Sequence, residues 1–311
     1  MDEFLKIESF IVHPLASGFI SISLLLGFLT LAVWNHNLFL KNYKSEWRDL
    51  EIFLLFFSIL GVTGQAIRIL YFFSLLNFQI LKFVGVILII IGLFGTARFF
   101  LKLEIYVRFK KNIQLFPFWA SFVLVLYLIL AICPPTDADS LDYHLGFPLS
   151  ILRSGTFEPL FDWHHSRLIG SGEFLNLLGL VNGTDNLQAL LNFFSLGMLV
   201  WFFVRVSENT TNASRLSIML ILSLPVFLFL IPNQKPQFSG SIALFFVISY
   251  AFLFQNIKKK ELIIYAGCFF YAVSLKYSFY VTGSIIMLYL FWKSWKSKTV
   301  KDFLIFGACF Y

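Results

Sequence analysis

Long apolar runs, separated by short polar segments, form the dominant pattern in this chain. A membrane-spanning helix needs about 20 mostly apolar residues, so each run predicts one crossing of a bilayer. The runs cover about Phe10–Trp34, Ile52–Leu75, Phe78–Phe100, Ile113–Cys133, Leu187–Val206, Leu216–Ile231 and Phe238–Phe254.

A further apolar run, Leu262–Trp292, is about half as long again as one crossing requires. Lys276, Tyr277 and Ser278 interrupt it near its middle, which predicts two short helices that meet at Lys276. Another apolar run begins near Phe303, and the sequence ends inside it. Because half a span cannot satisfy its own backbone in lipid, we expect this chain to be the N-terminal part of a longer protein.

Composition supports the same class of protein. Hydrophobic residues make up 59% of the 311 residues and charged residues only 13%, whereas a soluble domain carries roughly 25% charge. The sequence therefore predicts an all-α integral membrane protein, a multi-spanning helical bundle. The net charge of +7 does not indicate nucleic-acid binding, because the lysines and arginines lie in short loops between the apolar runs.

The basic residues occupy every second loop. Cytoplasmic loops of membrane proteins carry the excess of lysine and arginine, so these loops are predicted to be cytoplasmic and the alternate ones to face outward from a bacterial inner membrane. The outward segments include Leu76–Gln79, the IPNQKPQ turn and Lys276. The basic segments are Lys41–Arg48, Arg98–Lys111, Arg205–Arg215, Lys258–Lys260 and Lys293–Lys301.

One long polar segment, Pro134–Glu173, interrupts the apolar pattern on the predicted outer side. It divides the chain into four N-terminal spans (1–133), an extracytoplasmic loop with juxtamembrane helices (134–186), and about four further spans plus the start of another (187–311). The loop holds six acidic residues and three of the five histidines. Carboxylates and imidazoles are the side chains that catalyse proton transfer, so the loop is the candidate site.

The first part of the loop predicts an amphipathic helix on the membrane surface. Leu141, Leu145, Leu149 and Leu152 recur at helical spacing, and we expect a bend at Pro148. Just before this helix stands Asp139, and Asp142 follows three residues later, on the same side. Two interpretations remain open and are compatible. Asp139 is an N-cap with Asp142 in the first turn, or the two carboxylates are functional groups at the lipid interface.

Other polar residues are candidates to bind a substrate. His144 is either part of the site or a packed imidazole bonded to a carboxylate. Lys235 and Lys276, on the same predicted side, either contact a phosphate or extend to water. No pair of histidines has the spacing of a metal site, so no cofactor is predicted, and a divalent cation is left open. The remaining candidates are Asp137, Tyr143, His164, His165, Arg167 and Glu173.

The string DADSLDYHLGFP, followed by Leu152–Gly155 as L-x-x-G, resembles the first large outer loop of bacterial GT-C membrane glycosyltransferases, the group related to protein mannosyltransferases and family 39. The NQKPQF turn and the break at Lys276 are similar to that group's lysine-bearing outer turns. The resemblance implies that Asp139 is the catalytic base and that Asp137 or Asp142 supplies a second carboxylate. Members commonly have one span before this loop, whereas four are predicted here.

The expected function is therefore transfer of a sugar from a polyprenyl-phosphate donor to a glycan, lipid or protein acceptor, among membrane lipids and without nucleic acid. Asp139 and Asp142 are the expected catalytic residues. The chemistry is consistent with the residues themselves, since a carboxylate accepts the acceptor's proton and a cation stabilises the departing phosphate. Two alternatives are a transporter or flippase of lipid-linked glycans, and a non-catalytic subunit of cell-envelope polysaccharide assembly.

Overall fold

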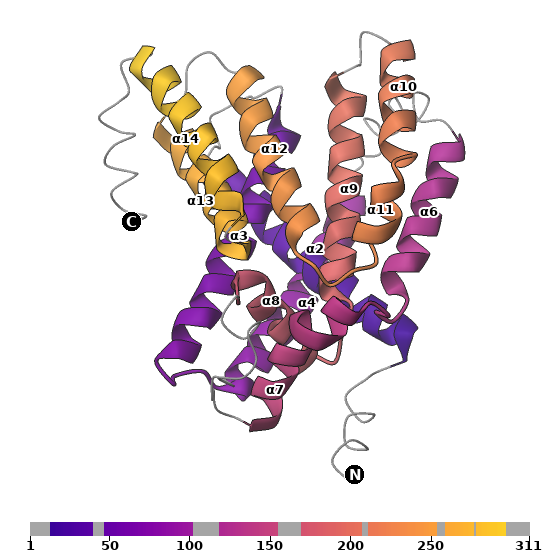
Figure 1. The fold of residues 1–311 in the computed structure, drawn as a ribbon, viewed down its shortest axis with the longest axis vertical. Coiled ribbons are helices and arrows are strands. Elements are labelled where there is room, and N and C mark those ends of the chain that lie inside the picture. The colour runs from indigo at the N-terminus through magenta and orange to yellow at the C-terminus, as the bar shows by residue number, and fades with distance from the viewer. Residues whose placement is uncertain are drawn as a thin grey trace.

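In a computed structural model of the chain, the structure describes residues 13–39, 47–101, 118–154, 169–206, 211–253, 259–276 and 278–296. These residues fold into helices that are joined by turns (Figure 1). The predicted all-helical class is thus confirmed for the described part of the chain.

The N-terminal helices pack through glycines. They are α2 (Pro14–Phe39), α3 (Arg48–Phe72) and α4 (Phe78–Leu101). A Cβ atom on Gly27 would lie 2.2 Å from the Leu88 carbonyl oxygen, and one on Gly92 would lie 2.2 Å from the Ser23 carbonyl oxygen. Small residues at these positions let the backbones of α2 and α4 approach closely, as in membrane helix pairs.

The remaining elements surround a short helical layer at one end of the bundle. The transmembrane-like helix α6 leads into a π-helix, η1, and the short helices α7 and α8, and then the chain returns through longer helices. Their bounds are α6 (Phe118–Ile132), η1 (Ser140–His144), α7 (Gly146–Ser154), α8 (Ser171–Val181), α9 (Leu187–Val206), α10 (Thr211–Leu222), α11 (Pro225–Leu230), α12 (Gln237–Leu253), α13 (Lys259–Leu275) and α14 (Phe279–Lys296).

Among the described residues, four helices are long and apolar enough to cross a membrane, namely α2, α3, α4 and α9. Further apolar helices are shorter, among them α6, α12, α13 and α14. The helix α4 leaves large apolar side chains uncovered, including Phe83 at 64% and Phe94 at 75% exposure. Exposed apolar surface on this scale marks a membrane or protein contact, in agreement with the predicted membrane protein.

The predicted break at Lys276 is confirmed, because α13 ends at Leu275 and α14 begins at Phe279. The run Leu216–Ile231, which was predicted to form one span, is not one continuous helix. Pro225 divides that run into α10 and α11, and Leu224 before it is extended, with φ −67° and ψ 116°. A proline lacks the N–H that a helix interior needs, and its ring disfavours helical geometry at the preceding residue.

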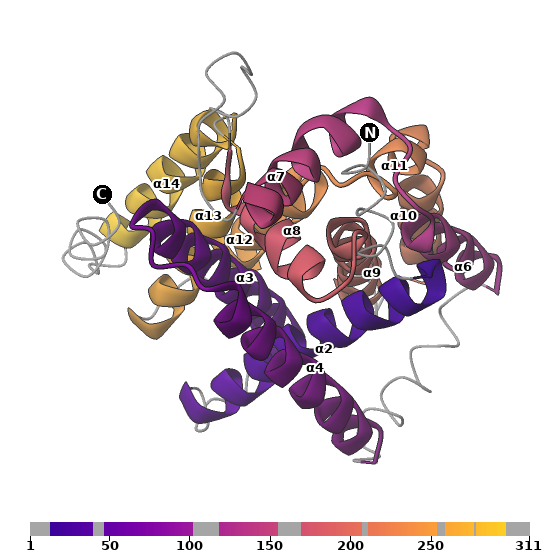
Figure 2. The same cartoon turned by 90° about the horizontal axis from the view of Figure 1, so that it is seen from below.

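The bundle has two polar ends. We call the end that carries segment 133–145, turn 231–236 and Lys276 the loop end. There Ser171 contacts Ser274 at 2.6 Å between their hydroxyl oxygens, and Figure 2 shows α8 between α9 and α13. We call the opposite end the basic end. There Arg205 pairs with Asp49, with 3.6 Å between Nε and Oδ2.

Candidate functional site

The acidic segment after α6 begins with a cap and a π-helix. Asp137 Oδ1 accepts a hydrogen bond from the Ser140 backbone N–H at 2.9 Å, which is the capping role expected of an aspartate at a helix start. The side chain of Asp139 makes no capping bond. The prediction that Asp139 is the cap is therefore wrong. Its carboxylate is 65% exposed and forms an ion pair instead.

The partner of Asp139 in this ion pair is Lys235. Lys235 Nζ lies 2.7 Å from Asp139 Oδ2 and 3.9 Å from Asp137 Oδ1. The ammonium also lies 5.1 Å from the centre of the Phe229 ring, a distance at which a cation is attracted to an aromatic face. The Lys235 side chain is 12% exposed, so its charge is largely removed from water and depends on these carboxylates. The ion pair joins turn 231–236 to the segment after α6.

Buried polar contacts hold turn 231–236 in place. The side-chain amide of Asn192, on α9, donates to the carbonyl oxygens of Leu230, Asn233 and Lys235 at 3.0, 3.0 and 3.1 Å. From the other side, the Gln234 backbone N–H donates to Ser140 Oγ at 2.9 Å. Because both the turn and the π-helix are tied into the bundle, the position of Lys235 relative to Asp139 is set by the fold.

A second, buried pair lies behind the π-helix. His144 Nδ1 and Glu173 Oε1 are 2.7 Å apart, and the two side chains are 2% and 1% exposed. Glu173 Oε2 accepts the Gly170 backbone N–H at 2.7 Å, and the Asn176 amide donates to the His144 carbonyl oxygen at 3.0 Å. His144 is thus a packed imidazole bonded to a carboxylate, one of the two predicted alternatives. The pair fastens the π-helix to α8.

Tyr143 stacks beside this pair, with 3.9 Å between the centres of its ring and the His144 ring. Burial raises the pKa of the Tyr143 hydroxyl well above its usual range, and the charges of Glu173 and Asp139 raise it further. The hydroxyl therefore remains protonated across the physiological range and is available as a hydrogen-bond donor.

The buried face of this segment agrees with the predicted apolar face only in part, since Leu145 is buried at 7% exposure. Leu141 is 52% exposed, whereas Ser140 and His144 are buried together with Phe147 and Ile151. The polar residues take the inner face because each finds a buried partner, Gln234 for Ser140 and Glu173 for His144. The bend expected at Pro148 stays a prediction.

Leu145 separates the π-helix from α7. Pro148 lies in the first turn of α7, where proline is tolerated. A π-helical turn of this kind is rare and is found most often at functional sites.

The structure brings Asp137, Asp139 and Lys235 into direct contact and places the His144–Glu173 pair beside them. Asp142 is exposed on the π-helix. Lys276 is exposed at the same end, after Leu275, whose carbonyl oxygen would lie 2.4 Å from a Cβ atom on Gly170. The predicted site residues His164, His165 and Arg167 lie outside the described residues.

Several buried polar atoms at the loop end have no hydrogen-bond partner among the described residues. Each such atom costs about 1–3 kcal/mol, so their concentration here requires an explanation. They are Asp137 Oδ2, Asn176 Oδ1, Asn233 Nδ2, and Gln234 Oε1 and Nε2. Of these residues only Asp137 was predicted from the sequence, and Asn192 was not predicted either. The signal was the presence of Gln188 and Asn192, four residues apart, in an otherwise apolar span.

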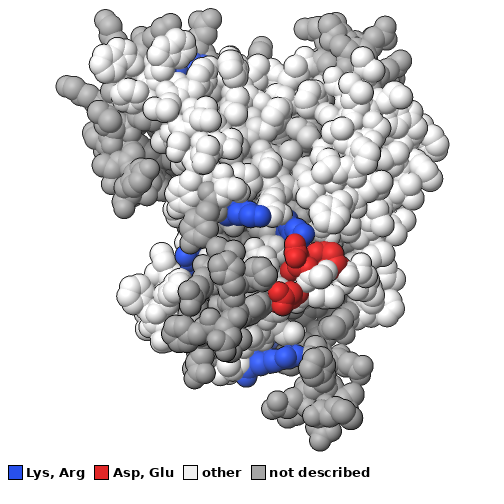
Figure 3. Space-filling view, viewed as in Figure 1, with Lys and Arg blue, Asp and Glu red and all other residues white. Residues whose placement is uncertain are grey.

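The charged residues of the visible face are concentrated. Figure 3 shows acidic and basic side chains side by side in one patch, while most of the described surface around them is uncharged. Opposite charges at an exposed rim attract charged ligands and contribute little to stability. No group of three histidine, cysteine or acidic side chains suited to a metal ion occurs within the described ranges, and a divalent cation stays open.

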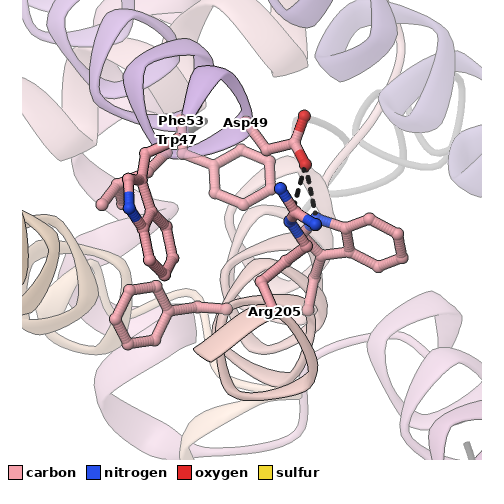
Figure 4. Close-up of a pocket in the computed structure, with 7 residues that line it drawn as sticks. Trp47, Asp49, Phe53 and Arg205 are labelled. Atoms are coloured by element: carbon pink, nitrogen blue, oxygen red, sulfur yellow. Dashed lines mark hydrogen bonds and ion pairs between the residues drawn. The ribbon is translucent and has the colours of Figure 1, made fainter. Parts of the chain in front are cut away.

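A pocket at the basic end offers a contrast (Figure 4). Trp47, Phe53 and Phe202 line it, together with Asp49 and Arg205. The Trp201 indole N–H donates to Asp49 Oδ2 at 3.2 Å. The volume of the pocket is about 10 Å³, which is room for about one water molecule. A pocket of this size does not admit a sugar or a lipid headgroup.

No curated protein and no solved structure matches the chain. The family described as the DUF1420 N-terminal domain matches residues 97–295. The match begins at the end of α4, so α6 is the one described helix that lies wholly inside it before the acidic segment. Asp137, Asp139 and Lys235 all fall within the match. Because it covers well over half of the sequence, the chain belongs to the DUF1420 N-terminal domain family.

Proposed function

We propose that this protein transfers a sugar from a polyprenyl-phosphate donor to an acceptor on the outer side of the bacterial inner membrane, with Asp139 as general base. The observation that carries the proposal is the ion pair between Asp139 and Lys235. An exposed carboxylate stands just past the end of α6 and lies 2.7 Å from a lysine of another turn. This combination supplies both a proton acceptor and a phosphate-binding cation.

The reaction uses these two groups in one displacement. The acceptor hydroxyl oxygen forms a bond to the anomeric carbon, and its proton passes to the Asp139 carboxylate. The bond between the anomeric carbon and the phosphate oxygen breaks on the opposite face, and its electron pair leaves with the polyprenyl phosphate. The configuration at the anomeric carbon is therefore inverted. The donor is already activated, so the proposal needs no cofactor.

Lys235 has a role in both states of the site. Without the donor lipid, the Lys235 ammonium contacts the carboxylates of Asp139 and Asp137. A donor phosphate competes for the same ammonium, since charge-assisted bonds to phosphate are as strong as those to carboxylate. Binding of the donor then places Lys235 on the leaving group and releases Asp139 to act as a base. Lys276 and Arg167 are further candidates to hold the phosphate, and Asp142 is the candidate second carboxylate.

The topology supports the choice of donor. Arg48, Arg205 and Lys293 belong to helix ends opposite the loop end, whereas Arg68, Lys82 and Arg153 lie toward the loop end. The long basic segments of the sequence, such as Lys258–Lys260 and Lys293–Lys301, all adjoin the opposite end, and on this excess the positive-inside rule favours a cytoplasmic position for that end. The acidic segment then faces outward, where no nucleotide pool supplies activated sugars. A lipid-borne donor reaches this position from within the bilayer.

The test is replacement of Asp139 with Asn in protein reconstituted in vesicles that contain a radiolabelled polyprenyl-phosphate sugar and envelope acceptors. We expect the transfer rate to fall by at least about 100-fold, the usual contribution of a general base. Asp49→Asn is the matched control, because Asp49 is also ion-paired but lies at the basic end. Full transfer by the Asp139→Asn variant would remove Asp139 from the reaction and favour a non-catalytic role.

A further inference from the structure

The atoms without partners at the loop end are arranged around one turn. Gln234 is 0% exposed, and neither Oε1 nor Nε2 of its side chain has a hydrogen-bond partner within the described part of the chain. Its neighbour Asn233 is 5% exposed and has an unpartnered Nδ2. Asp137, whose Oδ1 caps the π-helix, keeps a buried and unpartnered Oδ2. The unpartnered atoms therefore include both hydrogen-bond donors and hydrogen-bond acceptors.

Hydrogen bonds fix the position of turn 231–236, so the turn cannot move to give these polar atoms partners. The Gln234 backbone N–H is bonded to Ser140 Oγ, and Asn192 binds the carbonyl oxygens on either side, those of Asn233 and Lys235. Gln188 is about as buried, at 1% exposure, and its Nε2 donates to both Asn192 and Ser239, so that only its Oε1 lacks a partner among the described residues. Gln234 is held in a position where its amide lacks such partners.

We propose that Gln234, with Oδ2 of Asp137, forms a subsite for the sugar hydroxyls of the donor lipid. This inference rests on the proposed function. A carboxamide presents one acceptor and one donor group side by side, which matches two neighbouring hydroxyls of a sugar, and a carboxylate oxygen accepts a third. Lys235, the next residue along the turn, is the cation assigned to the phosphate. The subsite therefore matches hydroxyls attached close to a phosphate.

Other ligands fit these groups less well. A phosphate alone could accept from the amide nitrogens of Gln234 and Asn233 but would leave the acceptor oxygens of Gln234 and Asp137 without a donor. A lipid tail would leave all of the polar atoms unsatisfied. A metal cation would find oxygen ligands but would lie near the ammonium of Lys235. A sugar phosphate uses the donors, the acceptors and the cation together.

The experiment compares two lipids by native mass spectrometry of the full chain in detergent, namely polyprenyl phosphate and the same lipid carrying mannose or glucose. We expect the wild type to bind at least one sugar-bearing lipid about tenfold more tightly than the bare lipid. Gln234→Leu should remove this preference and leave the affinity for bare polyprenyl phosphate unchanged. Gln79→Leu, the same change at an exposed position of the loop end, should retain the preference.

The outcomes separate the subsite from the proposed function. A wild type that binds the bare and sugar-bearing lipids equally overturns the subsite, whatever the variants do. A Gln234→Leu variant that keeps the preference overturns it as well, and in both cases the Asp139→Asn result still decides the proposed function. A wild type that binds none of the lipids removes the proposed function and the subsite with it. Thermal unfolding of each variant checks folding, and Gln234→Glu provides an isosteric second variant.

Discussion

Two buried histidine–glutamate pairs stand at opposite ends of the bundle with almost identical geometry. At the basic end, His36 Nε2 lies 2.7 Å from Glu51 Oε2, with exposures of 3% and 1%. At the loop end, His144 and Glu173 show the same separation and nearly the same burial. In each pair the second carboxylate oxygen also has a donor, the Tyr250 hydroxyl for Glu51 and the Gly170 N–H for Glu173.

The surroundings of the two pairs differ. Tyr250 closes the basic-end pair against the Tyr265 ring, 5.1 Å away between centres, and the nearby pocket holds room for about one water. The loop-end pair instead supports a π-helix next to Asp139 and Lys235 and to the unpartnered atoms around Gln234. A buried pair of this kind therefore has a structural role. Because His36 Nδ1 at the basic end is also buried without a partner among the described residues, function is indicated at the loop end by the exposed ion pair together with the unpartnered groups around Gln234.

The largest expected difference between the two ends is all-or-none labelling. Cys133, exposed at the loop end, should react with a membrane-impermeant maleimide in intact spheroplasts once Cys309 is replaced by Ser. A cysteine at Asn37, exposed at the basic end, should react only in inverted vesicles, in a variant that also carries Cys133→Ser. Cys268 is buried and does not interfere. The reverse labelling would place the acidic segment in the cytoplasm and end the proposed function.

The next largest effect concerns the two glutamates. Removal of one partner from a buried ion pair costs about 3–5 kcal/mol, so Glu51→Ala and Glu173→Ala should lower the free energy of unfolding by similar amounts, measured by denaturation in detergent. The milder Gln variants should differ in function. Glu173→Gln should reduce sugar transfer, because His144 belongs to the helix beside Asp139, whereas Glu51→Gln should not. Equal transfer by both Gln variants would contradict a positioning role for the loop-end pair.

The two ends also differ in how far the sequence predicts them. Apolar runs located the long helices, because a bilayer imposes a length that is visible in hydrophobicity alone, and the charged break at Lys276 was found in the same way. Pro225 was overlooked inside the run Leu216–Ile231, although proline chemistry divides that run. The burial of Ser140 and His144 in the acidic segment was not predicted, because it depends on their hydrogen-bond partners, which hydrophobic spacing does not reveal.

The candidate site was predicted as residue types on one side of the membrane, and not as contacts. Asp139 and Lys235 were both expected to bind or react, but their ion pair depends on α9 and on the Asn192 amide, which are distant from Asp139 in sequence. Asp137 and not Asp139 caps the segment, because the residues directly before the π-helix, from Ala138 on, are already helical. Tertiary partners, rather than local pattern, decided both assignments.

The smallest expected difference in transfer rate is between variants of the two ion pairs Lys235–Asp139 and Arg205–Asp49. Lys235→Met should lower the rate of sugar transfer by about 100-fold, near 2.7 kcal/mol, because the departing phosphate loses its cation. Arg205→Met removes the equivalent charge from the Asp49 pair at the basic end and should leave transfer within about twofold of the wild type.

Steady-state measurements can locate where the Lys235 effect arises. If Lys235 stabilises the leaving group, the loss appears in kcat as well as in kcat/KM, because the interaction strengthens as the bond to phosphate breaks. A rise in KM alone would mean that Lys235 holds the donor equally in the ground state and the transition state. An equal loss in the Arg205→Met variant would show that neither pair is specific to the reaction, and the contrast between the two ends would then be one of exposure only.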